Sequence, residues 1–188
     1  MREIREILSD LPLEVKSMKE AGINVDVVED GATFEENALI KARAIHAVSG
    51  GIVLADDSGL VVDYMDGMPG IYSARFMGED TSYDIKNQAI IDALKKAEGE
   101  ERSARFVCAI AAVLPNGSER VVRATMEGRI GYEIAGANGF GYDPIFYYPP
   151  MGVSTAEMSP EDKNQVSHRG NALKVFYEKL KEAGYADK

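Results

Sequence analysis

The stretch Ile52-Val-Leu-Ala-Asp-Asp-Ser-Gly-Leu60 joins an apolar, β-branched run to an abrupt polar end. The apolar half is typical of a buried β-strand. Carboxylates at the end of a buried strand are costly unless a metal ion, a basic partner or a task in proton transfer offsets or uses their charge. We therefore expect a strand that leads into an acidic site at Asp56 and Asp57.

A basic cluster near the C-terminus carries the opposite charge. The segment Lys163-Asn-Gln-Val-Ser-His-Arg169 places two cations and a histidine within seven residues. Lysine and arginine are strong phosphate partners, and arginine can bind phosphate in a bidentate manner. The alternative interpretation is a solvated basic turn. Taken together, the acidic and basic segments predict a site for a magnesium-bound anion.

Composition limits the possible partners. The 188 residues are enough for one domain with a substantial core, in one or two lobes, and the net charge is -10. A diffuse negative surface repels nucleic acid and anionic membranes, so neither is expected as a partner. The first residues are too charged for a signal peptide, and no apolar run approaches membrane-spanning length. The single cysteine, Cys108, excludes an internal disulfide, and its place in an apolar run predicts a buried, inert thiol rather than a nucleophile. With no signal peptide or membrane span expected, a reducing cytoplasm is the expected location.

Apolar spacing and turn residues predict an α/β fold with a mixed sheet. Thr33 and Glu36 form a capping-box pattern, with Thr33 as N-cap, at the start of a helix that would end at Gly50. Ser159 and Pro160 are typical of another helix start. The expected helices cover residues 4–11, 33–48, 82–96 and 171–183, with one more beginning at 160. The expected strands cover residues 13–15, 23–28, 52–57, 60–63, 104–114, 120–126 and 144–148, and the turn at 115–117 predicts a hairpin.

Asp57 and Glu36 are the candidate metal ligands. Magnesium takes one or two carboxylates together with substrate phosphates, and Asp57, in a loop expected after the strand, could bind it or orient an attacking water. The alternative is that Asp56 and Asp57 only cap the following turn, as the pattern Asp-Ser-Gly often does. Glu36 could share the metal or serve only the capping box. Lys41 is expected on a solvated face unless the site turns toward it.

A glycine-rich run, Gly136-Ala-Asn-Gly-Phe-Gly-Tyr-Asp-Pro144, could let the backbone approach a ligand closely. Phe140 or Tyr142 could stack on a flat base, and Asp143 could accept hydrogen bonds from base N–H groups. No Gly-Lys-Ser or Gly-Lys-Thr follows, so the run is not a phosphate-binding P-loop. The alternative is a simple loop connection.

These segments resemble the inosine triphosphate pyrophosphatase family, which acts on non-standard purine nucleotides. The resemblance spans nearly the whole chain. It implies a single domain over residues 1–188, with a two-lobed α/β fold and a long mixed central sheet flanked by helices. It also implies Mg²⁺, a homodimer, and hydrolysis of ITP, dITP and XTP to the monophosphate and pyrophosphate, which cleanses the nucleotide pool. The motifs that carry it are Thr33-Phe-Glu-Glu-Asn37, Ala55-Asp-Asp-Ser-Gly-Leu60, Pro69-Gly-Ile-Tyr-Ser-Ala-Arg75, Gly139-Phe-Gly-Tyr-Asp-Pro144 and Lys163 with Ser167-His-Arg-Gly170.

The resemblance also implies a role for each matching residue. Asp57 would be the catalytic carboxylate and a magnesium ligand, and Glu36 would be the other metal carboxylate. The remaining positions would contact the substrate, and those from Phe140 to Asp143 would recognise the base. These substrate-contact residues are Ser58, Phe140, Gly141, Tyr142, Asp143, Lys163, His168 and Arg169.

One part of the family pattern has no counterpart in this sequence. The family begins with a strand and a Ser/Thr-Gly-Asn loop that grips the triphosphate, whereas Met1 here lies at the following helix. We therefore expect a chain shortened at its N-terminus relative to the family, without the first strand. The alternative function is a nucleotide-binding module with impaired catalysis. A haloacid-dehalogenase-type phosphatase fits less well, because Asp56-Asp57-Ser58 does not supply its Asp-x-Asp pattern.

Overall fold

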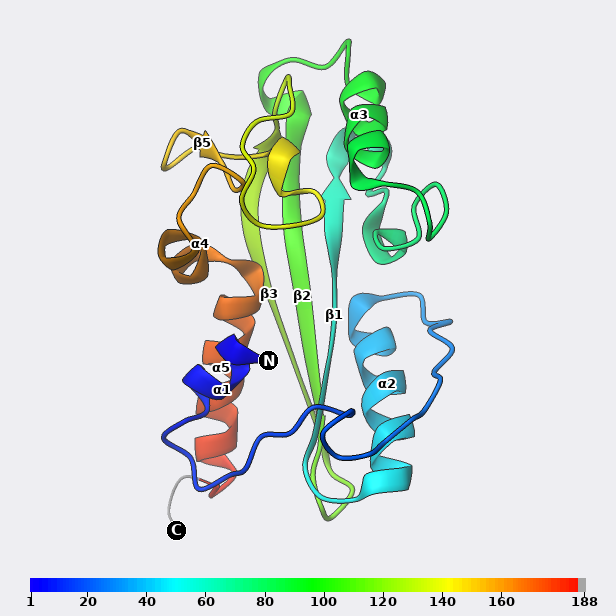
Figure 1. Ribbon diagram of the computed structural model, residues 1–188, viewed down its shortest axis with the longest axis vertical. Helices are drawn as coiled ribbons and strands as arrows, with labels where there is room; N and C mark the ends of the chain where they lie inside the picture. Colours follow the sequence, from blue (N-terminus) through cyan, green and yellow to red (C-terminus); the bar gives the residue numbers. More distant parts are fainter. Residues whose placement is uncertain (186–188) are drawn as a thin grey trace. The chain divides into compact units, whose positions relative to one another are not determined.

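The structure of the protein is a computed structural model that describes residues 1–185. Among these residues, the regular elements are five α-helices, five strands and four short 3-10 helices (Figure 1). The helices are α1 (Arg2–Ile7), α2 (Phe34–Ser49), α3 (Tyr83–Ala93), α4 (Pro160–Val166) and α5 (His168–Glu182). The strands are β1 (Val53–Val62), β2 (Ser103–Val113), β3 (Glu119–Ile130), β4 (Phe146–Tyr148) and β5 (Val153–Ser154).

The five strands form one sheet in the order β1-β2-β3-β4-β5. Each strand therefore lies beside its successor in the chain, and the strands run antiparallel. The predicted α/β class is confirmed, and so is the hairpin, whose turn is closed by the Leu114 N–H donating to the Ser118 carbonyl at 2.9 Å. The expected mixed sheet is instead antiparallel, because each connection, including the long one through α3, brings the chain back in the opposite direction.

Two strand predictions were wrong. Residues 13–15 and 23–28 form no strand; they belong to an irregular segment between α1 and α2. Residues 23–28 alternate between half-buried and exposed positions, but they have no partner strand to form a ladder. The expected break after Asp57 is also absent, because β1 continues through Asp57, Ser58 and Gly59 to Val62.

Helix α2 forms where its capping pattern predicts. The Thr33 hydroxyl accepts a hydrogen bond from the Glu36 N–H at 3.1 Å, and the Glu36 carboxylate accepts one from the Ala32 N–H at 2.6 Å. The second bond reaches one residue beyond the N-cap that a standard capping box would use. Gly50 ends the helix with a positive φ of 60°, a conformation that glycine adopts readily.

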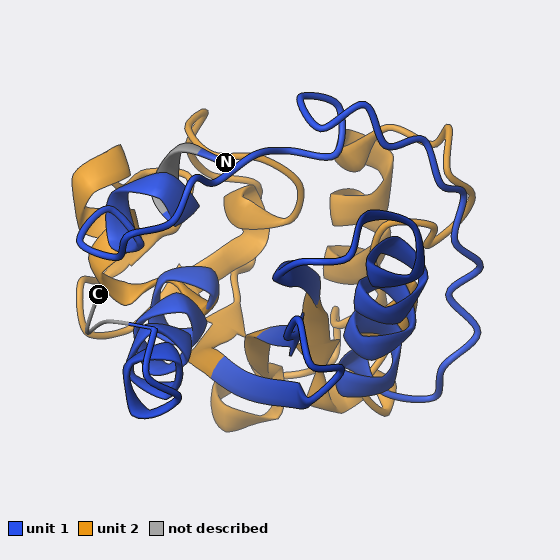
Figure 2. Ribbon diagram, turned by 90° about the horizontal axis from the view of Figure 1, so that it is seen from below, with its two compact units in different colours: residues 1–57, 108–124, 169–188 blue, residues 58–107, 125–168 orange. Residues whose placement is uncertain are grey.

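The chain divides into two compact units, which Figure 2 colours separately. Unit 1 contains residues 1–57, 108–124 and 169–188, and unit 2 contains residues 58–107 and 125–168. This division agrees with the predicted two lobes. The unit boundaries fall between Asp57 and Ser58 and between His168 and Arg169, within two of the predicted site segments.

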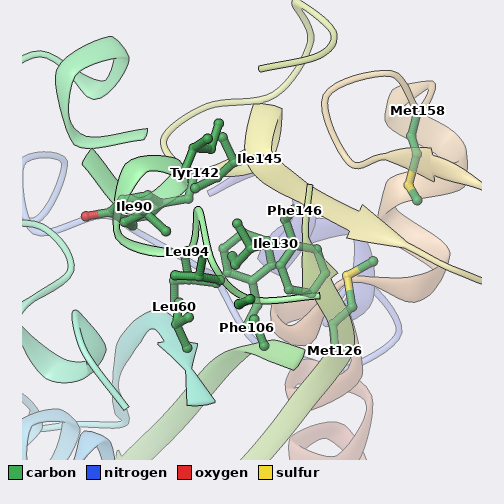
Figure 3. Packing of buried hydrophobic residues seen from close by; sticks show 14 residues of the cluster. Leu60, Ile90, Leu94, Phe106, Met126, Ile130, Tyr142, Ile145, Phe146 and Met158 are labelled. Carbon is green, nitrogen blue, oxygen red and sulfur yellow. The ribbon is translucent and has the colours of Figure 1, made fainter. Parts of the chain in front are cut away.

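Each unit has its own apolar cluster. In unit 1, Leu8 and Leu11 pack with Leu173 and Phe176 of α5 and with inward-facing residues of β2, including Cys108, which is buried as predicted. In unit 2, α3 packs on the sheet residues that Figure 3 shows from close by. The labelled members of that cluster are Leu60, Ile90, Leu94, Phe106, Met126, Ile130, Tyr142, Ile145, Phe146 and Met158. Among residues 1–185, no helix is long and apolar enough to cross a membrane.

A buried arginine ties three segments of unit 2 together. The Arg102 side chain, only 2% exposed, donates to the Ile130 carbonyl at 2.8 Å and to the Gly131 carbonyl at 2.6 Å. It also donates to the carbonyls of Leu94 at 2.7 Å and Ala97 at 3.1 Å, just after α3. Burial lowers the pKa of the guanidinium, and the four carbonyl oxygens supply the hydrogen bonds that this buried cation needs.

Replacing Arg102 with methionine would leave these carbonyl oxygens buried without a donor. We expect Arg102→Met to lower the free energy of unfolding by at least about 3 kcal/mol, measured by urea denaturation. The control Arg102→Lys keeps the charge but reaches fewer carbonyls, so its loss should be smaller. A loss below about 1 kcal/mol in Arg102→Met would contradict this account.

Candidate active site

The acidic site of unit 1 is built around Asp57 on β1. The Lys41 ammonium, on α2, lies 3.8 Å from Asp57 Oδ1 and 3.3 Å from Glu29 Oε1. The Asp57 side chain is 11% exposed, and its Oδ2 atom is buried without a hydrogen-bond partner among the described residues. A carboxylate with one loosely paired oxygen and one unpaired oxygen can still accept a proton, a water or a cation.

Burial sets the acidity of Asp57. Removal from water raises the pKa of its carboxyl group above the usual range, because the charged form loses hydration. The Lys41 charge and a polar interaction with Asn37 oppose the shift, and the nearby Glu29 and Asp56 charges add to it. The net pKa is raised, which makes Asp57 a better proton acceptor than an ordinary aspartate.

Asp56 has a different environment from its neighbour. Its Oδ2 accepts a hydrogen bond from Arg169 at 2.8 Å, within unit 1. Successive side chains of a strand point to opposite faces, so Asp56 and Asp57 are separated by the strand that carries both. Arg169, predicted to contact substrate, is thus already paired with a carboxylate.

Glu36 lies in the first turn of α2 and is exposed. Its carboxylate accepts a hydrogen bond from the Ala32 N–H, so Glu36 helps to cap the start of α2, as the structural alternative predicted. Gly31 lies directly against it, since an added Cβ would come within 2.8 Å of the Glu36 Cβ. Its predicted role as a metal ligand stays a prediction.

The side chains of unit 1 fit a magnesium ion that takes one or two ligands from the protein and the others from water or substrate phosphates. No group of three histidine, cysteine, aspartate or glutamate side chains among residues 1–185 is arranged to hold a metal. The unpaired Asp57 Oδ2 is nevertheless a hard oxygen ligand, and Mg²⁺ normally keeps waters or substrate phosphates beside one or two carboxylates.

In unit 2, the glycine-rich loop closes on its own aspartate. Asp143 is 3% exposed, and its Oδ2 accepts hydrogen bonds from the Phe140 N–H, at 2.8 Å, and from the Lys163 ammonium. Its Oδ1 accepts from the Thr155 hydroxyl at 2.9 Å. These donors all belong to the chain, and the expectation that Asp143 also receives base N–H groups stays a prediction.

The structure separates the two aromatic candidates. Phe140 is 72% exposed, and the Lys163 ammonium lies 4.7 Å from its ring centroid. Tyr142 is buried, packs edge-on against Tyr83 at 5.2 Å, and donates its hydroxyl to the Ser73 carbonyl at 2.6 Å. Burial raises the pKa of the Tyr142 hydroxyl, which remains a donor. Of the two rings, that of Phe140 is the exposed one, and its role in stacking on a base stays a prediction.

The other predicted residues have structural neighbours of their own. The Gly141 carbonyl accepts a hydrogen bond from the Asn87 amide at 3.1 Å, and the His168 ring stacks on Phe106 at 5.0 Å between centroids. Ser58 is half-buried on β1. A separate cavity of about 460 Å³ in unit 2, lined by residues such as Arg102 and Tyr132, contains none of the predicted site residues.

Sequence reasoning gave no role to Asn37 or Thr155, and it left the role of Lys41 open. Asn37 and Lys41 are four positions apart on α2, so they share a face, and polar residues on a half-buried face could have revealed them. Lys41 meets the stated exception to a solvated face, because its ammonium lies between Glu29 and Asp57 and therefore faces the acidic site. Thr155 had no signal in the sequence, since its partner Asp143 is twelve residues away.

The raised pKa of Asp57 predicts a stability cost. The folded state binds this proton more tightly than the unfolded state does, so stability falls as pH rises from the ordinary carboxyl range through the raised pKa. Without divalent cations, Asp57→Asn should therefore be more stable than the parent at about pH 7.5, with a smaller difference at about pH 5. Urea midpoints at both pH values measure this. The control Asp56→Asn, which loses the Arg169 pair, should be destabilised by up to about 1 kcal/mol; a less stable Asp57→Asn would contradict the interpretation.

Comparison with known proteins agrees with the motif resemblance. A sequence model described as the Ham1 family matches residues 1–179. A protein of Clostridium perfringens named dITP/XTP pyrophosphatase is 46% identical over 187 residues, which cover 96% of this chain and 92% of the relative. The structure of a HAM1 protein from Coxiella burnetii has a TM-score of 0.89 at 39% identity and covers 96% of this chain and 92% of that one. A dITP/XTP pyrophosphatase from Mycobacterium abscessus has a TM-score of 0.78 at 40% identity, with 93% and 91% covered. On this similarity over almost its whole length, the chain belongs to the Ham1 family.

Proposed function

We propose that this protein hydrolyses dITP, ITP and XTP to the nucleoside monophosphate and pyrophosphate, and so removes deaminated purine nucleotides from the nucleotide pool. Curated relatives at 44–46% identity are named dITP/XTP pyrophosphatases, which makes a hydrolase of phosphoanhydride bonds the expected enzyme class. The observation that carries the proposal is the buried Asp57 carboxylate, whose Oδ2 makes no well-formed hydrogen bond among the described residues, although Asn37 and the Lys41 charge partly offset its burial.

Asp57 would act on the attacking water. A carboxylate with a raised pKa accepts a proton more readily, so Asp57 can orient the water and take its proton as the water attacks the α-phosphorus. Lys41, beside Asp57, would stabilise the negative charge that develops on the phosphate oxygens. Glu36 and Asp57 would hold Mg²⁺, which when bound neutralises phosphate charge and polarises the scissile anhydride.

The glycine-rich loop of unit 2 would select the base. Phe140 offers an exposed ring for stacking, and the Lys163 ammonium near that ring is a donor without acceptor capacity. The 6-oxo group of a deaminated purine can accept from such a donor, whereas the 6-amino group of adenine cannot. Ser58, Gly141, His168 and Arg169 would complete the substrate contacts. We also propose a cytoplasmic homodimer, as the family resemblance implies.

Asp57→Asn should lose at least about 100-fold in turnover, the scale of a lost acid–base or charge-stabilising group. The measurement is pyrophosphate and orthophosphate released from dITP by the folded variant. Asp26→Asn, an exposed aspartate of unit 1, serves as the matched control and should keep full activity. Near-normal turnover in Asp57→Asn would refute the assignment of Asp57, and orthophosphate as the first product would refute the reaction.

Removing divalent cations tests the metal. Chelation should reduce pyrophosphate release from dITP by at least about 100-fold, and added Mg²⁺ should restore it, because charge neutralisation on the phosphates is lost and regained. The same assay with dATP should give a kcat/KM at least about 10-fold lower than with dITP. Binding of ITP without pyrophosphate release at saturating Mg²⁺ would instead indicate a module that binds without catalysis.

A further inference from the structure

Thr155 is fully buried and rigidly placed. It follows β5 directly, is 0% exposed, and its N–H donates to the Phe146 carbonyl of β4 at 2.9 Å. Its hydroxyl lies 2.9 Å from Asp143 Oδ1 and 3.1 Å from the Asp143 carbonyl oxygen. Because the backbone of Thr155 is held by the sheet, the hydroxyl presents a fixed donor to the Asp143 carboxylate.

The other oxygen of that carboxylate organises the loop. With Oδ1 engaged by Thr155, Oδ2 accepts from the Phe140 N–H and the Lys163 ammonium. The packing is tight, since a Cβ added at Gly139 would lie 2.2 Å from Oδ2 and 3.1 Å from Lys163 Nζ. A rotation of the Asp143 side chain would therefore move both the Phe140 backbone and the Lys163 ammonium.

We propose that Thr155 is a positioning residue for base selection. Its hydroxyl fixes the orientation of Asp143, and Asp143 in turn sets the stacking ring of Phe140 and the donor of Lys163. Thr155 itself is buried and does not reach a ligand. This inference rests on the proposed function of the loop, and it adds a residue that acts through the loop rather than on the substrate.

The substitution Thr155→Val tests the hydroxyl alone. Valine matches threonine in shape but has no donor, so Asp143 Oδ1 would lose its buried partner and the carboxylate would no longer be held in one orientation. The effect should appear in base recognition and leave the chemistry at the phosphates nearly unchanged. Thr155→Ser keeps the hydroxyl and should rescue. Ser154→Ala is a matched control, because the Ser154 hydroxyl is also buried and donates to the Ala135 carbonyl at 2.7 Å without contacting Asp143.

For Thr155→Val we expect a KM for dITP about 10-fold higher with kcat changed by less than about 3-fold, the pattern of lost uniform binding. The ratio of kcat/KM for dITP to that for dATP should fall by about 10-fold. Calorimetry should show dIMP binding weakened by about 10-fold, with little change for dAMP. Thr155→Ser and Ser154→Ala should keep both the ratio and the dIMP affinity within about 2-fold, whatever their urea midpoints.

Three results would overturn the proposal. Thr155→Val could retain the selectivity ratio and dIMP affinity; Thr155→Ser could be as impaired as Thr155→Val; or Ser154→Ala could lose selectivity equally, which would indicate general loosening of unit 2. A wild-type protein that releases no pyrophosphate from dITP would refute the proposed function instead. In that case the dIMP affinities of the three variants still decide whether Thr155 positions the loop.

Discussion

The desolvation of the Asp57 carboxylate is the constraint on which the rest of the candidate site depends. Strand β1 runs without interruption through Asp56 and Asp57, so the backbone holds both side chains and neither can turn away as a loop residue could. A buried carboxylate oxygen without a donor costs free energy that an apolar residue would not. Such a cost is typical of positions where a charge has a chemical task. The Lys41 ammonium reduces the cost without removing it.

A second buried carboxylate, Asp143, shows the opposite solution. Donors from Thr155, Phe140 and Lys163 meet its two oxygens, so its charge is fully engaged inside unit 2. The two aspartates are of the same type, and the difference between them is the number of donors that each one meets. A carboxylate with all its donors present organises a loop, and one that lacks donors remains able to react.

The sequence predicted those features whose causes lie within a few residues. The capping of α2 by Thr33, the start of α4 at Ser159 and the β2–β3 hairpin each depend on local hydrogen bonds, and each was found. The continuation of β1 past Asp57 could not be read locally, because Asp-Ser-Gly is typical of a turn and only the neighbouring strand keeps it extended. The false strands at 13–15 and 23–28 failed for the same reason, since a strand needs a partner that its own sequence does not name. The sequence indicated which residue types form the candidate site. The contact of Lys41 with Asp57 and that of Thr155 with Asp143 exist only in the folded chain, so the sequence could not reveal them.

The burial of Cys108 has a practical consequence. It is the sole cysteine of the chain and is completely enclosed by the apolar cluster of unit 1. A thiol reagent can reach it only when that cluster opens, because thiols react as exposed thiolates. The rate of alkylation at this sulfur is therefore an intrinsic measure of how often the interior of unit 1 becomes accessible, obtained without introducing a label.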